Sequence, residues 1–171
     1  LSLEAQRRVL EKVASGASLA ETLDVLLWGV EARLSRVRAS VLLLDPDGVH
    51  LRHGAARQLP EGYMRAVDGL AIGEAVGSCG TAAWRGQTVI VREIATDPLW
   101  ADFAGLAASY GLVACWSWPI FSREGRVLGT FALYPDEPSE PDALTFEQVA
   151  IATHLAAIAI ARHREESALR E

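Results

Sequence analysis

Two pairs of apolar segments, each joined by a short turn sequence, constrain the fold of this chain more than any other feature. The first pair runs from Val41–Leu44 to His50–Ala56 through DPDG, and the second from Val113–Phe121 to Arg126–Tyr134 through REG. Proline, aspartate and glycine favour tight turns, so each pair predicts a β-hairpin. Val41–Leu44 is apolar without interruption, which indicates a strand buried on both faces. The chain therefore predicts an antiparallel sheet that is covered on both sides.

Three long segments with helical periodicity surround these hairpins. Apolar residues recur at helical spacing in 3–13, in 19–34 and in 149–159. Ser18 and Glu21 form a capping box, in which each side chain bonds a free N–H group at the start of the second helix. The order of elements begins with two helices and ends with one, and the hairpins lie between them.

The remaining segments complete the predicted layers. Thr145 and Gln148 form a second capping box, ahead of the last helix. Three long helices must bury their apolar stripes, so we expect all three on one face of the sheet. Residues 57–112, called the middle segment below, then cover the other face. Within it the sequence predicts short helices at 60–67, 77–84 and 102–110 and short strands at 69–72 and 88–91.

These expectations define an α+β fold class, an α/β sandwich. It has a central antiparallel sheet of about six strands, with the terminal helices packed on one face. A ligand pocket is expected on the other face, between the sheet and the middle segment, because irregular segments over a rigid sheet commonly carry binding sites.

Composition narrows the function classes. The 171 residues suit one domain, and the net charge of −6 without a Lys/Arg patch argues against nucleic-acid binding. Two cysteines, Cys79 and Cys115, make neither a disulfide framework nor a four-ligand zinc site. The charged, amphipathic start differs from a signal peptide, and the apolar stretch 149–161 is too short for a membrane span. We therefore expect a cytoplasmic protein without a bound metal.

Four segments resemble the GAF domains of bacterial sensor kinases and cyclic-di-GMP enzymes. They are HGAARQLPEGYMRAVDG (53–69), GSCGTAAWRGQTVIVREIATDPLW (77–100), YGLVACWSWPIF (110–121) and VLGTFALYP (127–135). The likeness covers roughly residues 15–163, which leaves 1–14 and 164–171 as helical extensions of a single GAF domain. It implies a sensory input module of two-component or cyclic-di-GMP signalling, which binds a small molecule and is not itself an enzyme. It also implies a homodimer through the terminal helices and an output domain, such as a kinase or a GGDEF or EAL domain.

The sequence GSCGT at 77–81 is the first candidate ligand site. Its glycines allow main-chain N–H groups to turn inward at a helix start, where the helix dipole is positive. The N–H groups of Ser78, Cys79, Gly80 and Thr81 could hold a small anion such as nitrate, as in GAF nitrate receptors. Alternatively, the glycines only make a tight connection between a strand and a helix.

Aromatic residues and a serine form the second candidate site. Trp116 and Trp118 share one face of a strand, and Cys115 and Ser117 share the other, but alternation does not tell which pair lines the pocket. We select Trp116 as an aromatic wall, Ser117 as a hydroxyl partner and Trp100 as part of a lid. The alternative for the tryptophans is packing in the core.

One histidine and two thiols raise further possibilities. His53 could hydrogen-bond a ligand or ligate haem, although a single histidine gives haem little support, and the cofactor remains unknown. Cys79 falls where a cysteine of free-methionine-sulfoxide reductases would lie, but the loop 101–111 lacks their catalytic cysteine. Buried structural thiols are the expected role. The alternatives to a sensor are thus a ligand-free dimerisation module and, less favoured, a thiol-dependent reductase.

Overall fold

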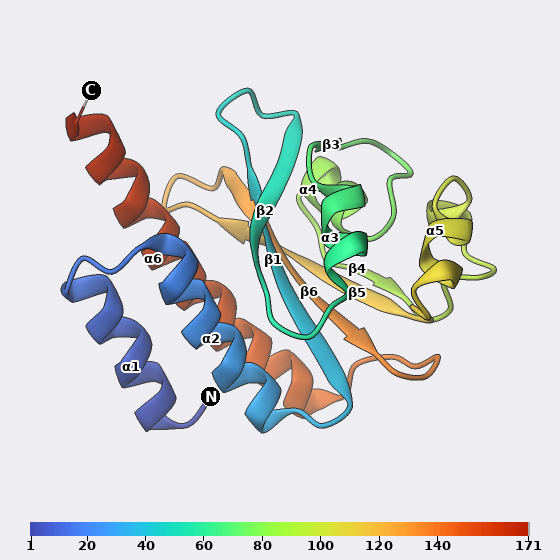
Figure 1. Ribbon diagram of the computed structural model, residues 1–171, viewed down its shortest axis with the longest axis horizontal. Helices are drawn as coiled ribbons and strands as arrows, with labels where there is room; N and C mark the ends of the chain where they lie inside the picture. The colour runs from blue at the N-terminus through green and yellow to red at the C-terminus, as the bar shows by residue number, and fades with distance from the viewer. Residues whose placement is uncertain (171) are drawn as a thin grey trace.

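The computed structural model describes residues 1–170 and is built on one six-stranded sheet in the order β3-β2-β1-β6-β5-β4 (Figure 1). The strands are β1 (Val37–Leu44), β2 (His50–Ala56), β3 (Leu70–Ala71), β4 (Val89–Val91), β5 (Cys115–Phe121) and β6 (Val127–Pro135). The helices are α1 (Leu3–Ala14), α2 (Leu19–Arg33), α3 (Glu61–Val67), α4 (Cys79–Arg85), the 3₁₀ turn η1 (Pro98–Trp100), α5 (Ala104–Ser109) and α6 (Ala143–Arg170). All strand pairings are antiparallel, so the predicted α+β class and six-stranded sheet are confirmed.

Strand β1 lies at the centre of the sheet, between β2 and β6. Its apolar residues contribute to both layers, because successive side chains point to opposite faces. Val41 belongs to the core on the helix side, whereas Leu42 belongs to the core under the middle segment. The uninterrupted apolar run therefore marks a strand that is buried on both faces, as the sequence predicts.

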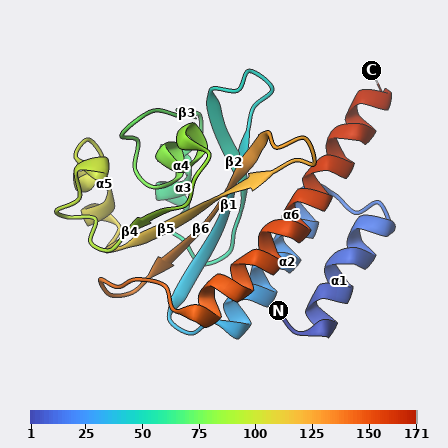
Figure 2. The ribbon, with the colours of Figure 1, turned by 180° about the vertical axis from the view of Figure 1, so that it is seen from behind.

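The terminal helices lie together on one side of the sheet, opposite the middle segment (Figure 2). Helices α2 and α6 contact the strands directly, while α1 packs mainly against α2 and α6. The expectation that all three helices lie on the sheet is therefore wrong for α1. Its buried stripe contains only Ala5 and Val9, which suffices to cover the neighbouring helices but is too narrow to share a sheet face.

Helix α6 begins earlier than its predicted capping box. The carboxylate of Asp142 accepts hydrogen bonds from the main-chain N–H and the hydroxyl of Thr145, at 2.8 and 2.7 Å. Asp142 thus caps the helix, and the predicted cap, Thr145, lies within its first turn. Among residues 1–170, α6 is the one helix long and apolar enough to cross a membrane. It packs instead along the sheet, with Ala152, Leu155 and other residues buried in the core, as the central helix of a globular domain does.

The middle segment covers the opposite face of the sheet with α3, α4, α5 and η1 (Figure 1). Two hydrophobic cores result, one between the sheet and the long helices and one beneath the middle segment. The second core is richer in polar side chains, among them Ser78, Ser117 and Thr130, which are fully buried. This polar core contains the candidate site.

Candidate ligand pocket

A small cavity lies between strands β1 and β6 and the helices of the middle segment. Its lining residues are Ser40, Leu42, Tyr63, Met64, Val67, Leu70, Val76, Gly77, Ser78, Cys79, Trp100, Phe103, Leu106 and Tyr134. The free volume is about 20 Å³, which holds about one water molecule. A pocket is therefore present between the sheet and the middle segment, as the sequence predicts, and it is small.

The cavity lining contains no carboxylate, lysine, arginine or histidine. Aliphatic and aromatic groups make up most of the wall, and hydroxyls and one thiol supply the polar atoms. Pockets of this composition bind apolar ligands and orient them through a few hydrogen bonds. The nature of the polar atoms therefore decides what the cavity can recognise.

Two tyrosines provide one group of polar atoms. The hydroxyls of Tyr63 on α3 and Tyr134 on β6 are 3.0 Å apart and hydrogen-bonded, and their rings meet edge to face at 5.8 Å. Burial raises the pKa of both phenols well above the usual value, because the phenolate would lose its hydration. Both tyrosines are therefore neutral. One hydroxyl donates to the other, which leaves the second hydroxyl its own proton to donate.

Trp100 is fixed in the wall of the cavity. Its indole N–H donates to the Ser78 hydroxyl at 3.0 Å, and that hydroxyl donates to the carbonyl oxygen of Cys115 at 2.9 Å. Gly77 has a positive φ of 61°, and a Cβ there would come within 3.4 Å of the indole ring. Trp100 is 4% exposed. It is thus a buried part of the pocket wall, and its role as part of a lid stays a prediction.

The two thiols meet at Ser117. Its hydroxyl lies 3.0 Å from the sulfur of Cys79 and 3.9 Å from that of Cys115, and both cysteines are buried and free. The hydrogen bond with Cys115 and a further one with Ser117 lower the pKa of Cys79 to about 7, whereas burial raises the pKa of Cys115. Cys79 lines the cavity, whereas Ser117 lies beneath Cys79 and is not part of the lining.

Two buried hydroxyls, those of Ser40 and Thr130, have no hydrogen-bond partner. Buried polar groups are normally satisfied, so each such group needs an explanation. Ser40 is 1% exposed and lines the cavity, whereas Thr130 is buried next to Cys79 and is not part of the lining. Sequence reasoning missed Ser40, Tyr63 and Tyr134. The one available signal was a serine placed beside an apolar run in β1.

At the start of α4, where the sequence predicts an anion site, neighbouring groups of the protein surround Gly80 and Thr81. The side chain of Val76 covers Gly80, and a Cβ at that glycine would lie 2.6 Å from Val76. The Thr81 hydroxyl accepts from the N–H of Val76 at 3.0 Å and donates to the carbonyl oxygen of Gly77 at 2.6 Å. Gly80 and Thr81 therefore serve the tight connection into α4, and neither lines the cavity.

Two other predicted residues lie outside the pocket. Trp116 belongs to the core on the helix side, and its indole N–H donates to the carbonyl oxygen of Ser139 at 2.9 Å. The face of β5 that turns toward the cavity carries Cys115 and Ser117 instead, which corrects the choice of Trp116. His53 is exposed on β2, where its main-chain N–H donates to Asp68 at 2.8 Å, and it does not line the cavity.

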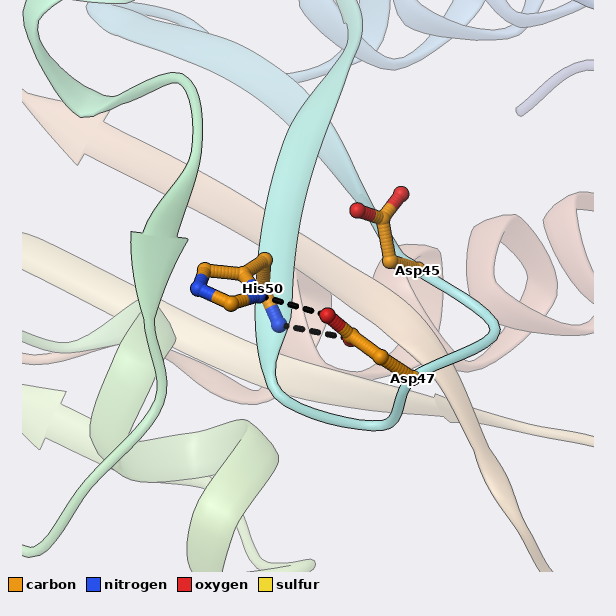
Figure 3. Close-up of side chains that lie close together, drawn as sticks. All are labelled: Asp45, Asp47 and His50. Carbon is orange, nitrogen blue, oxygen red and sulfur yellow. Dashed lines mark hydrogen bonds and ion pairs between the residues drawn. The ribbon is translucent and has the colours of Figure 1, made fainter.

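A cluster of Asp45, Asp47 and His50 has the side chains of a metal site (Figure 3). Asp47 bonds the imidazole of His50 at 2.6 Å and the N–H group of Val49 at 2.7 Å. These bonds lower the pKa of Asp47 to about 2. Asp45 pairs with Arg52 at 2.8 Å. Each of the three side chains thus has a partner within the hairpin, and the cluster is explained by the turn that joins β1 to β2.

Comparison with known proteins agrees with this architecture. The model of the GAF domain family matches residues 16–161. The methyl sulfide methyltransferase-associated sensor of Methanosarcina acetivorans is 39% identical over 166 residues. That match covers 97% of this chain but 17% of the relative, so the chain spans about a sixth of the length of that protein.

Solved structures show the same fold. A domain named for a two-component sensor histidine kinase of Sinorhizobium meliloti is 27% identical, with a TM-score of 0.72 over 90% of this chain and 98% of that one. The free methionine-R-sulfoxide reductase of Neisseria meningitidis is 17% identical, with a TM-score of 0.68 over 97% and 95%. The second likeness shows the fold alone. Together with the match to the family model, these findings establish that the chain belongs to the GAF domain family and is a sensor domain of the kind found in signalling proteins.

Proposed function

We propose that this chain is a small-molecule sensor module, and that its ligand occupies the cavity between β1, β6 and the middle segment. The observation that carries the proposal is Ser40, a buried hydroxyl without a partner that lines an otherwise largely apolar cavity. A ligand with a hydrogen-bonding group would satisfy it. The printed name of the relative from Methanosarcina, a sensor, supports the same role.

Ligand entry requires the cavity to expand. Val76, Phe103 and Leu106 are only partly buried and lie on the loops and helix that cover the cavity. Met64, on α3, has a flexible side chain that can repack around a ligand. The contracted cavity is then the ligand-free state, and binding would favour a state in which the middle segment lies farther from the sheet.

A direct connection from the cavity to the last helix supports signal transmission. Arg164 on α6 donates to the carbonyl oxygens of Leu44 at 2.6 Å and Leu128 at 3.3 Å. Leu44 lies two residues beyond Leu42, which lines the cavity. A displacement of β1 on ligand binding would therefore pull on α6, and this helix would carry it to an output domain. We propose a kinase or a GGDEF or EAL domain as that output, in a cytoplasmic two-component or cyclic-di-GMP signalling protein.

Exposed apolar residues on α1 and α2 support a homodimer as the signalling unit. Leu3 and Leu10 on α1 and Trp28 on α2 are large apolar residues that remain exposed. The ring of Trp28 carries the guanidinium of Arg8 at 5.9 Å. A second copy packed on α1 and α2 would cover these side chains. A ligand-free dimerisation module is the alternative function, and it rests on the same surface.

A reductase activity is not part of the proposal. Both thiols are buried, and although hydrogen bonds lower the pKa of Cys79 to about 7, no histidine, carboxylate or amine lines the cavity to exchange a proton with it. A thiol nucleophile needs access to substrate and a group that promotes its thiolate form. We therefore propose a non-enzymatic role.

The test combines native mass spectrometry of the freshly purified protein with a thermal-shift screen. The screen contains uncharged metabolites, nitrate, nucleotides and haem, because a compound that binds only the folded state raises its melting temperature. Leu42→Phe fills the cavity from β1, and Leu43→Phe is the matched control on the opposite face of the same strand. A sensor predicts stabilisation that Leu42→Phe abolishes and Leu43→Phe retains. A dimer that no compound stabilises would instead support the dimerisation module.

A further inference from the structure

We propose that the pocket takes an uncharged, mainly apolar small molecule with one hydroxyl or carbonyl group, and that Ser40 binds this group. This inference rests on the proposed function, because it concerns the same cavity. It goes further by naming the chemical class of the ligand and the residue that selects it.

The cavity lining lacks acidic and basic side chains that could pair with an ionic ligand. None of the fourteen lining residues is a carboxylate, a lysine, an arginine or a histidine, and the phenols of Tyr63 and Tyr134 stay protonated because burial opposes their ionisation. An anion or a cation would lose its hydration on entry and find no opposite charge in the lining. The segments that cover the cavity also carry the exposed carboxylates Glu74 and Asp102. The cavity therefore selects uncharged molecules.

Ser40 and Tyr134 lie on neighbouring strands, on the face of the sheet that lines the cavity. Strand pairing places Ser40 opposite Ala132 of β6, and Tyr134 lies two residues further along the same face of β6. Ser40 and Tyr134 are thus diagonal neighbours on the sheet, and Tyr134 is bonded to Tyr63. The hydroxyls of Ser40, Tyr63 and Tyr134 thus belong to one part of the cavity lining. A ligand group placed there can accept from one hydroxyl and, if it carries a proton, donate to another.

The hydroxyl of Ser40 is the one that lacks a partner. The Ser78 hydroxyl already bonds Trp100 and Cys115, and the two tyrosines bond each other. An unsatisfied buried hydroxyl destabilises the folded protein. Alanine at position 40 would avoid this cost, so we infer that the serine serves to hydrogen-bond a molecule in the cavity.

Thr130 provides a matched control. Its hydroxyl also lacks a partner and is fully buried, but it lies outside the cavity lining. Thr130→Val and Ser40→Ala each remove one unpartnered hydroxyl at little change in shape. Both variants should therefore be at least as stable as the wild type without ligand, while only Ser40→Ala should affect binding.

The experiment uses phenol, toluene and benzoate as probes, with binding followed by NMR titration of the whole chain. Phenol and toluene differ in one hydroxyl, and benzoate adds a negative charge. We expect phenol to bind about fivefold more tightly than toluene, as one neutral hydrogen bond would give, and benzoate not to bind. Ser40→Ala should reduce the affinity for phenol to that for toluene, and Thr130→Val should change neither.

Three results would overturn the inference. They are binding of benzoate as tight as that of phenol, an unchanged phenol affinity in Ser40→Ala, and no binding of phenol. The metabolite screen separates these failures from failure of the sensor itself. If a charged metabolite or nitrate stabilises the wild type and Leu42→Phe abolishes the effect, the sensor stands and the ligand class is wrong. If no compound stabilises the protein, both proposals fail.

Discussion

Gly129 is the position where the sheet leaves least room for a side chain. It lies within β6 and pairs with Leu43 of β1 and Ile120 of β5. A Cβ at residue 129 would overlap the carbonyl oxygen of Leu42 and lie 3.2 Å from the Cα of Leu43. These are main-chain atoms, so no side-chain rotation can relieve the overlap. Gly129→Ala therefore forces β1 and β6 apart at the centre of the sheet.

The expected loss of stability follows from this geometry. Overpacking in a core typically costs about 1–3 kcal/mol, and a collision with main-chain atoms belongs at the upper end, about 3 kcal/mol. For a domain of this size, about 3 kcal/mol lowers the melting temperature by roughly 6–12 °C. Thermal and urea unfolding, followed by circular dichroism, measures both quantities.

Gly105 provides the control for this substitution. It lies in α5, has no atom within 4 Å of the position of a Cβ, and carries no positive φ. Gly105→Ala should leave stability unchanged or raise it by about 0.5–1 kcal/mol, because alanine favours a helix. The reasoning fails if Gly129→Ala unfolds within 1 kcal/mol of the wild type, roughly a third of the expected loss. It also fails if the two variants lose equal stability.

Three further variants test other contacts. Burial raises the pKa of Glu31, whose side chain is 4% exposed, so the wild type loses stability as pH rises from 4.5 through the folded-state pKa. Urea unfolding across this range should show that the free energy of unfolding of Glu31→Gln rises relative to that of the wild type as the pH increases. A difference in stability that does not change with pH would contradict this prediction. Arg164→Ala removes two bonds to strand carbonyls and should cost about 1–3 kcal/mol. Amide hydrogen exchange that becomes faster only in the last turns of α6 would confirm that these bonds hold the end of the helix. Unchanged exchange would refute this. In Cys79→Ser the one remaining thiol is that of Cys115, which is buried. Iodoacetamide should modify this thiol in the folded protein on the order of 10³-fold more slowly than in the protein unfolded in urea. Comparable rates in the two states would mean that Cys115 is accessible in the folded protein.

Local chemistry explains which parts of the fold the sequence could predict. The bounds of β2, His50–Ala56, are those predicted, because a strong turn signal precedes the strand and fixes its start. The Ser18 hydroxyl accepts from the N–H of Glu21 at 3.1 Å, as the capping box requires. At α6 two capping residues, Asp142 and Thr145, lie three positions apart, and the sequence pattern did not distinguish them. The first one caps the helix.

The pocket was harder to predict because its residues come together only through tertiary contacts. Tyr63 and Tyr134 are 71 positions apart, and nothing local relates them. The orientation of β5 was equally open, since both of its faces carry residues that suit a core. The indole of Trp116 reaches the carbonyl oxygen of Ser139 on the helix side, and this contact turns Cys115 and Ser117 toward the cavity.

Strand register then explains why a cavity forms at this place. Ser40 of β1 pairs with Ala56 of β2 and with Ala132 of β6, and Ala132 pairs with Ser117 of β5. Four small residues therefore form a row across four neighbouring strands, on the face that the middle segment covers. Larger side chains in this row would fill the space beneath α3 and α4. No periodicity along the chain reveals the row, because its members lie in four different segments. The register thus determines which residue of the row reaches the cavity, because only Ser40 lines it.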